Sequence, residues 1–403
     1  MKFAHMADVH IGSWRDPKLR DLSTDAFLKA VLISIDHDVD FVLIAGDLFN
    51  TALPGIDNLK IVVKALRALR SKKIHVYIIP GSHDFSPSGK TMIDVLEEAG
   101  LLLNVVKGSV TDGKLFLKFV TDPKSGVKIT GMLGKKGTLE KHVYERLDLE
   151  SLEKEPGKKI FMFHSAIKEL MPTDFSKMDA MELSWLPKGF DYYAGGHVHI
   201  IKELSLEGHK NIVYPGPLFP ANFSELEDLG VGGFYIYDDG KIIREDINIK
   251  NTFLININIE HKTPQEVENL IYDKIKGKEF INTIVLLKIS GKLKSGKVSD
   301  INFKEIFTKI YSQGAFFVMK NTGKAVSEEF EEIRIDEKSF EDAEDALIKE
   351  HLGQVKVSKF DTGKEYEITK ALIKIFEEEK HEGEKVYEYE ERVQKEADKL
   401  LEL

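Results

Sequence analysis

The sequence contains no cysteine among its 403 residues. This absence excludes disulfide bonds, zinc sites with thiolate ligands and a cysteine nucleophile. Any metal ion would therefore be held by histidine, carboxylate and neutral oxygen ligands.

Long apolar runs are also missing. No window approaches the roughly 18 consecutive apolar residues that a membrane span requires, and the N-terminus lacks the charged and then apolar layout of a signal peptide. We therefore expect no contact with a membrane and a location in the cytoplasm. The apolar content of 42% still provides a large core, and the length predicts two or three domains.

A net positive charge, common in proteins that bind nucleic acids, is missing too, since the net charge is −10. The whole acidic excess lies in residues 331–403, which hold 23 acidic and 13 basic side chains. A neutral body leaves room for a local basic surface, whereas the acidic tail is expected to contact protein rather than phosphate.

The first 250 residues alternate between strand-like and helical patterns. Five segments read as strands or strand endings, at 41–47, 74–84, 159–165, 190–199 and 211–218. Helical periodicity is found at 22–36, 56–71 and 91–99. The continuously apolar strands are typical of buried central strands, so we predict a layered α/β fold.

Polar side chains follow four of these predicted strands and an apolar run at the N-terminus that also reads as a strand. They are Asp8, His10, Asp47, Ser82, His83, Asp84, His164, His197 and His199. Ligands gather at the carboxyl ends of strands in open α/β sheets, and Asp8 and His10, two positions apart, would project together. The set offers enough donors for two metal ions, with Asp47 as the natural bridge; the alternative is a set of unrelated strand caps.

The blocks DVH, GD, GSHD, FH and GGHVH resemble, in this order, those of the calcineurin-like metallophosphoesterases. Longer strings such as MKFAHMADVHIG and YPGPLFPANFSELED resemble one branch of this family, the archaeal Mre-eleven nucleases, which repair DNA double-strand breaks with a Rad-fifty ATPase. The resemblance is strong to about residue 250 and looser beyond. It implies a sandwich of mixed sheets flanked by helices, and a homodimeric, nucleoid-associated nuclease that cuts single strands and duplex ends.

The resemblance also implies a role for each polar residue, with two manganese ions per chain. One ion would be held by Asp8, His10, Asp47 and His199. The second would be held by Asp47, Ser82, His164 and His197. His83 would act on the scissile phosphate or the leaving oxygen, and Asp84 is expected to orient its ring.

Two positions depart from the family pattern. Ser82 stands where most members have Asn, and a hydroxyl is a shorter and weaker oxygen donor, so the second metal is expected to bind less tightly. Asn50 stands where a histidine usually helps to position DNA, which puts exonuclease activity in question while keeping Asn50 a candidate DNA contact.

The pattern changes at about residue 251. We predict a phosphoesterase domain at 1–250, a small α+β domain at 251–335 and a helical segment at 336–403. In the family the middle domain caps the nuclease site, and this makes Lys292, Lys294 and Lys297 candidate contacts to DNA. Each of them is equally well explained as a charged loop residue that contacts only solvent.

Apolar stripes indicate where partners bind. The helix at 56–71 has more apolar positions than one core face uses, and in the family it helps to form a dimer. Apolar stripes in the tail, at Tyr366–Phe376 and Val386–Leu400, predict two amphipathic helices. These helices would dock on the ATPase or simply pack on each other. Two other functions stay open: a phosphoesterase for small molecules or phosphoproteins, and a scaffold that has lost a metal.

Overall fold

A computed structural model describes residues 1–86, 91–134, 141–171, 180–327, 348, 362–378 and 386–401. The chain divides into two compact units, Met1–Glu329 and Phe330–Leu403. The division into three domains expected from the sequence stays a prediction.

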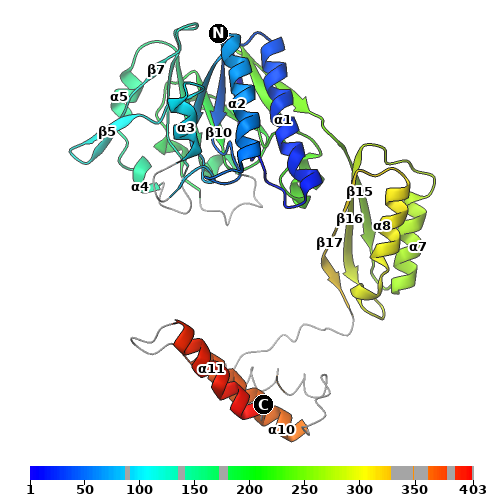
Figure 1. Ribbon diagram of the computed structural model, residues 1–403. Helices are drawn as coiled ribbons and strands as arrows, with labels where there is room; N and C mark the ends of the chain where they lie inside the picture. The colour runs from blue at the N-terminus through cyan, green and yellow to red at the C-terminus, as the bar shows by residue number, and fades with distance from the viewer. Residues whose placement is uncertain are drawn as a thin grey trace. The chain divides into compact units, whose positions relative to one another are not determined.

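Two six-stranded sheets form the larger part of the first unit (Figure 1). The first sheet contains, in spatial order, β14 (Lys241–Ile247), β13 (Gly232–Asp238), β1 (Lys2–Met6), β2 (Phe41–Ala45), β3 (His75–Ile79) and β4 (Leu103–Asn104). The second contains β11 (Lys202–Leu206), β12 (His209–Tyr214), β10 (Tyr192–Gly196), β9 (Lys159–His164), β8 (Lys128–Gly131) and β7 (Val120–Thr121). A separate hairpin consists of β5 (Gly108–Thr111) and β6 (Lys114–Leu117).

An apolar core joins the two sheets face to face. Phe3 and Phe41 of the first sheet stack with ring centroids 5.0 Å apart, and the ring of Tyr192 from the second sheet meets Phe3 edge-on. Ile160 and Met162 of β9 belong to the same buried cluster. This explains why the central strands are apolar on both faces, since one face packs on the other sheet and the second packs on helices.

Three helices pack on the outer face of the first sheet, namely α1 (Pro17–Asp36), α2 (Ile56–Ser71) and α3 (Met92–Glu98). The side chain of Asp16 caps α1, and Thr91 with Asp94 forms a capping box at α3. The short helices α4 (Lys141–Tyr144) and α5 (Leu149–Lys154) contribute to the core of the second sheet. The predicted layered α/β class is therefore confirmed, although the hairpins β5–β6 and β13–β14 were not predicted.

The topology places five strand ends at one edge. Strands β1, β2 and β3 run parallel in the first sheet, and β9 and β10 run parallel in the second. The loops that leave their carboxyl ends carry the polar residues singled out in the sequence.

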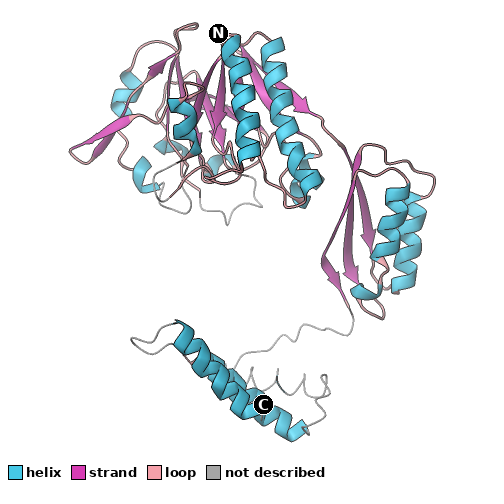
Figure 2. Cartoon of the chain, in the orientation of Figure 1, coloured by secondary structure: helices cyan, strands magenta, loops and turns pink. Residues whose placement is uncertain are grey.

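A small α+β layer follows from residue 251. Three parallel strands, β15 (Asn251–Asn258), β16 (Thr283–Lys292) and β17 (Phe317–Val326), carry two helices on one face, α7 (Pro264–Ile275) and α8 (Phe303–Ser312), as Figures 1 and 2 show. Ile284 and Leu286 of β16 belong to the apolar cluster that also contains Leu226 of α6 (Phe223–Leu229). The small sheet thus shares a core with the helix that precedes it.

The second unit contains two amphipathic helices, α10 (Thr362–Glu377) and α11 (Val386–Leu401), which pack on each other. Ile368 and Ala397 are buried, whereas Phe376 is 60% exposed. Most of the remaining predicted tail lies outside the described residues. None of the helices that the structure describes is long and apolar enough to cross a membrane.

Candidate metal centre

The backbone at the strand ends adopts an unusual conformation. Asp8, His10, Asp47, His197 and His199 all have positive φ angles, between 46° and 98°. Non-glycine residues rarely adopt this region, and such strain is concentrated at functional sites. The turns therefore fix the direction in which each side chain leaves its strand.

Two glycines allow the strand ends to approach closely. A Cβ atom on Gly46 would collide with the ring of His164, and one on Gly81 would collide with the carboxylate of Asp47. Gly46 also has a φ of 91°, which favours glycine. Glycine at both positions is thus a condition for packing these donors together.

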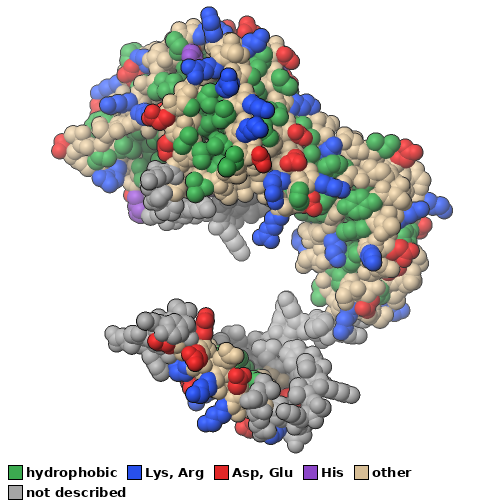
Figure 3. All heavy atoms as spheres, viewed as in Figure 1, with side chains coloured by type: hydrophobic (Ala, Val, Ile, Leu, Met, Phe, Trp, Pro, Cys, Tyr) green, Lys and Arg blue, Asp and Glu red, His purple; other side chains and the backbone are tan. Residues whose placement is uncertain are grey.

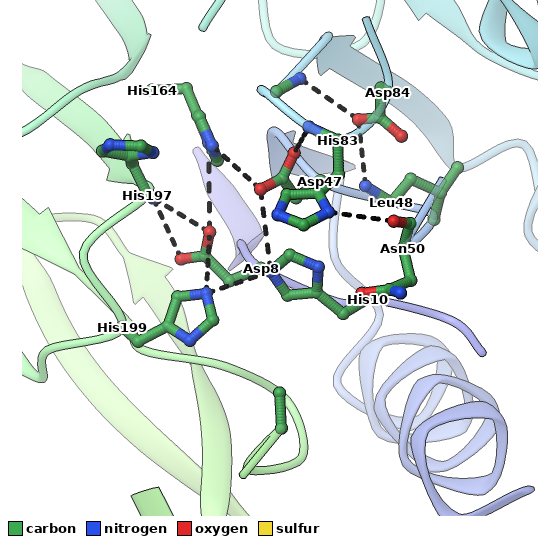
Figure 4. Close-up of polar contacts among 12 residues, drawn as sticks. Asp8, His10, Asp47, Leu48, Asn50, His83, Asp84, His164, His197 and His199 are labelled. Atoms are coloured by element: carbon green, nitrogen blue, oxygen red, sulfur yellow. Dashed lines mark hydrogen bonds and ion pairs between the residues drawn. The ribbon is translucent and has the colours of Figure 1, made fainter. Parts of the chain in front are cut away.

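The donors converge in three overlapping groups whose ligand atoms lie within 4.8 Å of one another (Figure 4). The groups are Asp8 with His10 and His199, His10 with Asp47 and His83, and Asp8 with Asp47 and His164. Asp8, His10 and Asp47 each belong to two groups, so a set of nitrogen and oxygen donors surrounds one small region.

The distances fit a divalent cation. The Nε2 atoms of His10 and His199 face each other at 3.0 Å, which is the spacing of two neighbouring ligands on one ion with bonds of roughly 2.1 Å. The ring of His164 donates from Nδ1 to the carbonyl of Ala45 at 2.8 Å, which aims its Nε2 at Asp47, 3.1 Å away. In the group of Asp8, Asp47 and His164 a backbone carbonyl therefore orients the imidazole, as is common for metal ligands.

The carboxylates change the titration of the rings. Burial opposes the charged form, but Asp47 and Asp8 raise the pKa of His164 to about 10. Burial also disfavours the charged form of His199, but Asp8 and Glu225 outweigh this effect and raise its pKa to about 9. For His10 burial dominates and lowers the pKa to about 3. Without a cation, His164 and His199 thus hold protons that a metal would displace.

His197 and Ser82 lie beside the three groups. The backbone N–H of His197 donates to both carboxylate oxygens of Asp8, at 2.9 and 3.1 Å, and its ring packs on that of His164 with centroids 5.1 Å apart. Ser82 is buried in the turn after β3. Their expected place as ligands of a second metal stays a prediction.

The structure corrects the role expected for Asp84. Its carboxylate accepts hydrogen bonds from the backbone N–H groups of Leu48, Phe49 and Gly81 at 3.0–3.1 Å, and it does not contact the ring of His83. The ring of His83 donates from Nδ1 to the backbone carbonyl of Asn50 at 2.9 Å. Asp84 therefore ties two loops together, because three buried N–H groups need an acceptor more than the half-buried ring of His83, which already has Asn50 as its partner.

The other predicted DNA contacts lie elsewhere in the first unit. Lys292 ends β16 and its backbone N–H donates to Glu260, whereas Lys294 and Lys297 are exposed beyond this strand. None of the three lysines belongs to the donor groups described above. Asn50 reaches the site through its backbone carbonyl on His83.

One functional contact was not predicted. Glu225 of α6 accepts a hydrogen bond from Nδ1 of His199 at 2.9 Å. In the structure Asn222 is the N-cap of α6 and Glu225 is its third residue, which is a local helix-start pattern. The partner 26 positions away could not be recognised from that local pattern.

Residues 1–200 match the sequence model of the calcineurin-like phosphoesterases. This part of the chain therefore belongs to that family, and the protein is a metal-dependent phosphoester hydrolase, as the motifs predicted.

Over most of its length the chain is similar to archaeal proteins named DNA double-strand break repair protein Mre11. The relative from Archaeoglobus fulgidus is 28% identical over 361 residues, which cover 84% of this chain and 77% of the relative. The relative from Methanococcus maripaludis is 29% identical over 301 residues, which cover 68% of this chain and 76% of the relative. A dimetal phosphatase from Danio rerio, of known structure, is 12% identical and covers 61% of this chain and 95% of its own with a TM-score of 0.41.

Proposed function

We propose that this chain is a manganese-dependent DNA nuclease that cuts single strands and duplex ends and acts with a Rad-fifty-type ATPase in double-strand break repair. The observation that carries the proposal is the convergence of imidazole and carboxylate donors at one edge of a phosphoesterase sandwich. The similarity to archaeal repair proteins, which extends beyond this sandwich, supports DNA as the substrate. Mixed nitrogen and oxygen donors suit manganese better than magnesium.

Two manganese ions per chain would share Asp47. The first would be held by Asp8, His10, Asp47 and His199, and the second by Asp47, Ser82, His164 and His197. When bound, such a pair of cations generates the nucleophile and stabilises the charge that develops on the attacked phosphate. The buried carboxylates hold the histidine rings in place before substrate arrives.

His83 is the group proposed to act on the phosphate. Because its Nδ1–H is committed to the carbonyl of Asn50, its Nε2 is the atom available to exchange a proton with the leaving oxygen. The backbone N–H of His83 also donates to Asp47 at 2.7 Å, which fixes this loop against the proposed bridging ligand.

The Asp47→Ala variant tests the metal chemistry. Loss of a shared ligand should abolish both high-affinity Mn²⁺ binding and the cleavage of labelled single-stranded DNA. Asp21→Ala, which removes an exposed carboxylate from α1, is the matched control and should cleave normally. Undiminished cleavage by the Asp47→Ala variant would end the two-metal proposal.

Ser82 favours a second candidate, a metallophosphoesterase scaffold with weakened catalysis. Such a scaffold would bind a single ion and leave DNA intact. A phosphoesterase for small molecules or phosphoproteins would instead hydrolyse phosphomonoesters and spare DNA. Three measurements on one preparation of the purified chain distinguish these functions: the metal content, the cleavage of DNA and the hydrolysis of a phosphomonoester.

A homodimer is proposed through α2 and α3. Ile56 and Val95 are 82% and 55% exposed, and Leu53, just before α2, is 74% exposed. Figure 3 shows hydrophobic side chains on the face that these helices form. Ile56→Asp should convert a dimer to a monomer in light scattering, whereas Leu32→Asp, at a 60% exposed position of α1, should not. If light scattering gives the mass of a dimer for both variants, the dimer contact lies elsewhere.

The tail helices are proposed to dock on the ATPase. The two helices are in contact and Ile368 and Ala397 are buried, whereas Phe376 is exposed, so an apolar group is available to a partner after the two helices have paired. Phe376→Glu should weaken co-purification with the ATPase while single-strand cleavage is unchanged, and Lys374→Ala on the same helix is the control. Full ATPase affinity of a chain truncated after residue 335 would show that the tail is not the docking element.

A further inference from the structure

His199 is held from behind by a carboxylate that is not one of the proposed metal ligands. Its Nδ1 donates to Oε1 of Glu225 at 2.9 Å, which leaves Nε2 directed toward Nε2 of His10. Glu225 is itself fixed, because its second oxygen accepts from the backbone N–H of Ala221 at 2.8 Å. A carboxylate in this position fixes the tautomer of the imidazole and makes Nε2 a better ligand.

The helix that carries Glu225 is also tied to the small α+β layer. Oε1 of Glu227 lies 2.6 Å from Nζ of Lys288 on β16, and both side chains are partly buried. At the end of α6 the hydroxyl of Thr252 donates to the carbonyl of Gly230 at 3.1 Å. Two independent polar contacts, in addition to the shared apolar core, therefore join α6 to β15 and β16.

The spacing of the two glutamates explains how one short helix serves both contacts. Successive residues of an α-helix are turned by about 100°, so positions two apart point to nearly opposite sides. Glu225 faces His199 while Glu227 faces Lys288. Because α6 has only seven residues, it has little length over which to bend between them.

We propose that Glu225 is the positioning residue for His199, and that the Glu227–Lys288 ion pair lets the docking of the small α+β domain set the geometry of this metal ligand. The proposal rests on the proposed metal site and goes beyond it. The attachment of α6 to this layer would then control how well the site holds its cation.

The test measures Mn²⁺ affinity by calorimetry on the full chain. Glu225→Ala should weaken binding by roughly 10- to 100-fold, the usual effect of losing such a partner. Glu225→Gln keeps an amide oxygen that can accept from Nδ1, so it should restore most of the affinity. Asp228→Asn, at an exposed position of the same helix, is the control and should bind as the parent chain does.

A spectroscopic readout separates positioning from general damage to the fold. Long-range ¹H–¹⁵N spectra of the metal-free chain, recorded above the His199 pKa of about 9 where the ring is neutral, should show a ring protonated at Nδ1, and a mixture of tautomers in Glu225→Ala. Glu227→Gln and Lys288→Met should each weaken Mn²⁺ binding less than Glu225→Ala does, and the double variant should be no weaker than either alone.

Three outcomes would overturn the proposal. Unchanged affinity and an unchanged His199 spectrum in a folded Glu225→Ala chain would remove Glu225 from any positioning role. Additive effects of Glu227→Gln and Lys288→Met would show that the pair does not act as a unit. If Glu227→Gln and Lys288→Met both bind Mn²⁺ as tightly as the parent chain, the contact between α6 and β16 does not affect His199. A parent chain that binds Mn²⁺ without cutting DNA would contradict the nuclease proposal alone.

Discussion

Replacing His83 with Gln should separate metal binding from catalysis. The ring lies 4.8 Å from that of His10, between centroids, and its Nδ1 is held by Asn50, so Nε2 faces the proposed cations without being needed as a ligand. Loss of a general acid or base typically lowers the rate by about 10² to 10⁴, which corresponds to about 2.7 to 5.4 kcal/mol in the activation barrier. Two Mn²⁺ ions should still bind.

The variant should remain folded. It loses one hydrogen bond from a half-buried ring, which costs about 1 kcal/mol in the free energy of unfolding. The assay is single-turnover cleavage of labelled single-stranded DNA at saturating Mn²⁺, with bound metal counted by electron paramagnetic resonance. His261→Gln, which removes an 86% exposed histidine, is the control and should cleave normally.

The competing role for His83 is that of a metal ligand, because its ring belongs to the donor group with His10 and Asp47. If bound manganese falls from two ions to one together with cleavage, His83 is a ligand and the reasoning above is wrong. Cleavage at the parental rate would exclude both roles.

Three further predictions concern residues in or near this centre. Ser82→Asn should tighten the second Mn²⁺ site in a titration, because an amide oxygen reaches further than a hydroxyl; an unchanged titration would show that another group already fills the position. Asp84→Asn should lower the free energy of unfolding by about 1 to 3 kcal/mol in urea, since its NH₂ group opposes a backbone donor, and equal midpoints would refute this. Burial lowers the pKa of His5 to about 3, so only the unfolded chain takes up this proton as the pH falls below about 6.5. Between pH 7 and 5 the parent should therefore lose about 2 kcal/mol more stability than His5→Gln, and parallel curves would contradict the shift.

The sequence by itself determined the elements and the chemical types of the site. The helix predicted at 56–71 matches α2, because its apolar periodicity arises from neighbours along the chain. The strand predicted at 41–47 likewise contains β2, which is followed by Gly46 and Asp47. Absence of cysteine and the order of the five blocks were enough to predict a family and a set of nitrogen and oxygen donors.

Only the tertiary structure decided how those donors are held. Asp84 binds backbone groups 35 and 36 positions away, Asn50 reaches His83 across 33, and Glu225 reaches His199 across 26. Such partners depend on which loops meet at the edge of the sheets, and hydrogen bonds between distant segments leave no periodic trace in the sequence. For the same reason β13 could not be placed beside β1, more than 220 residues earlier, until both strands were seen in one sheet.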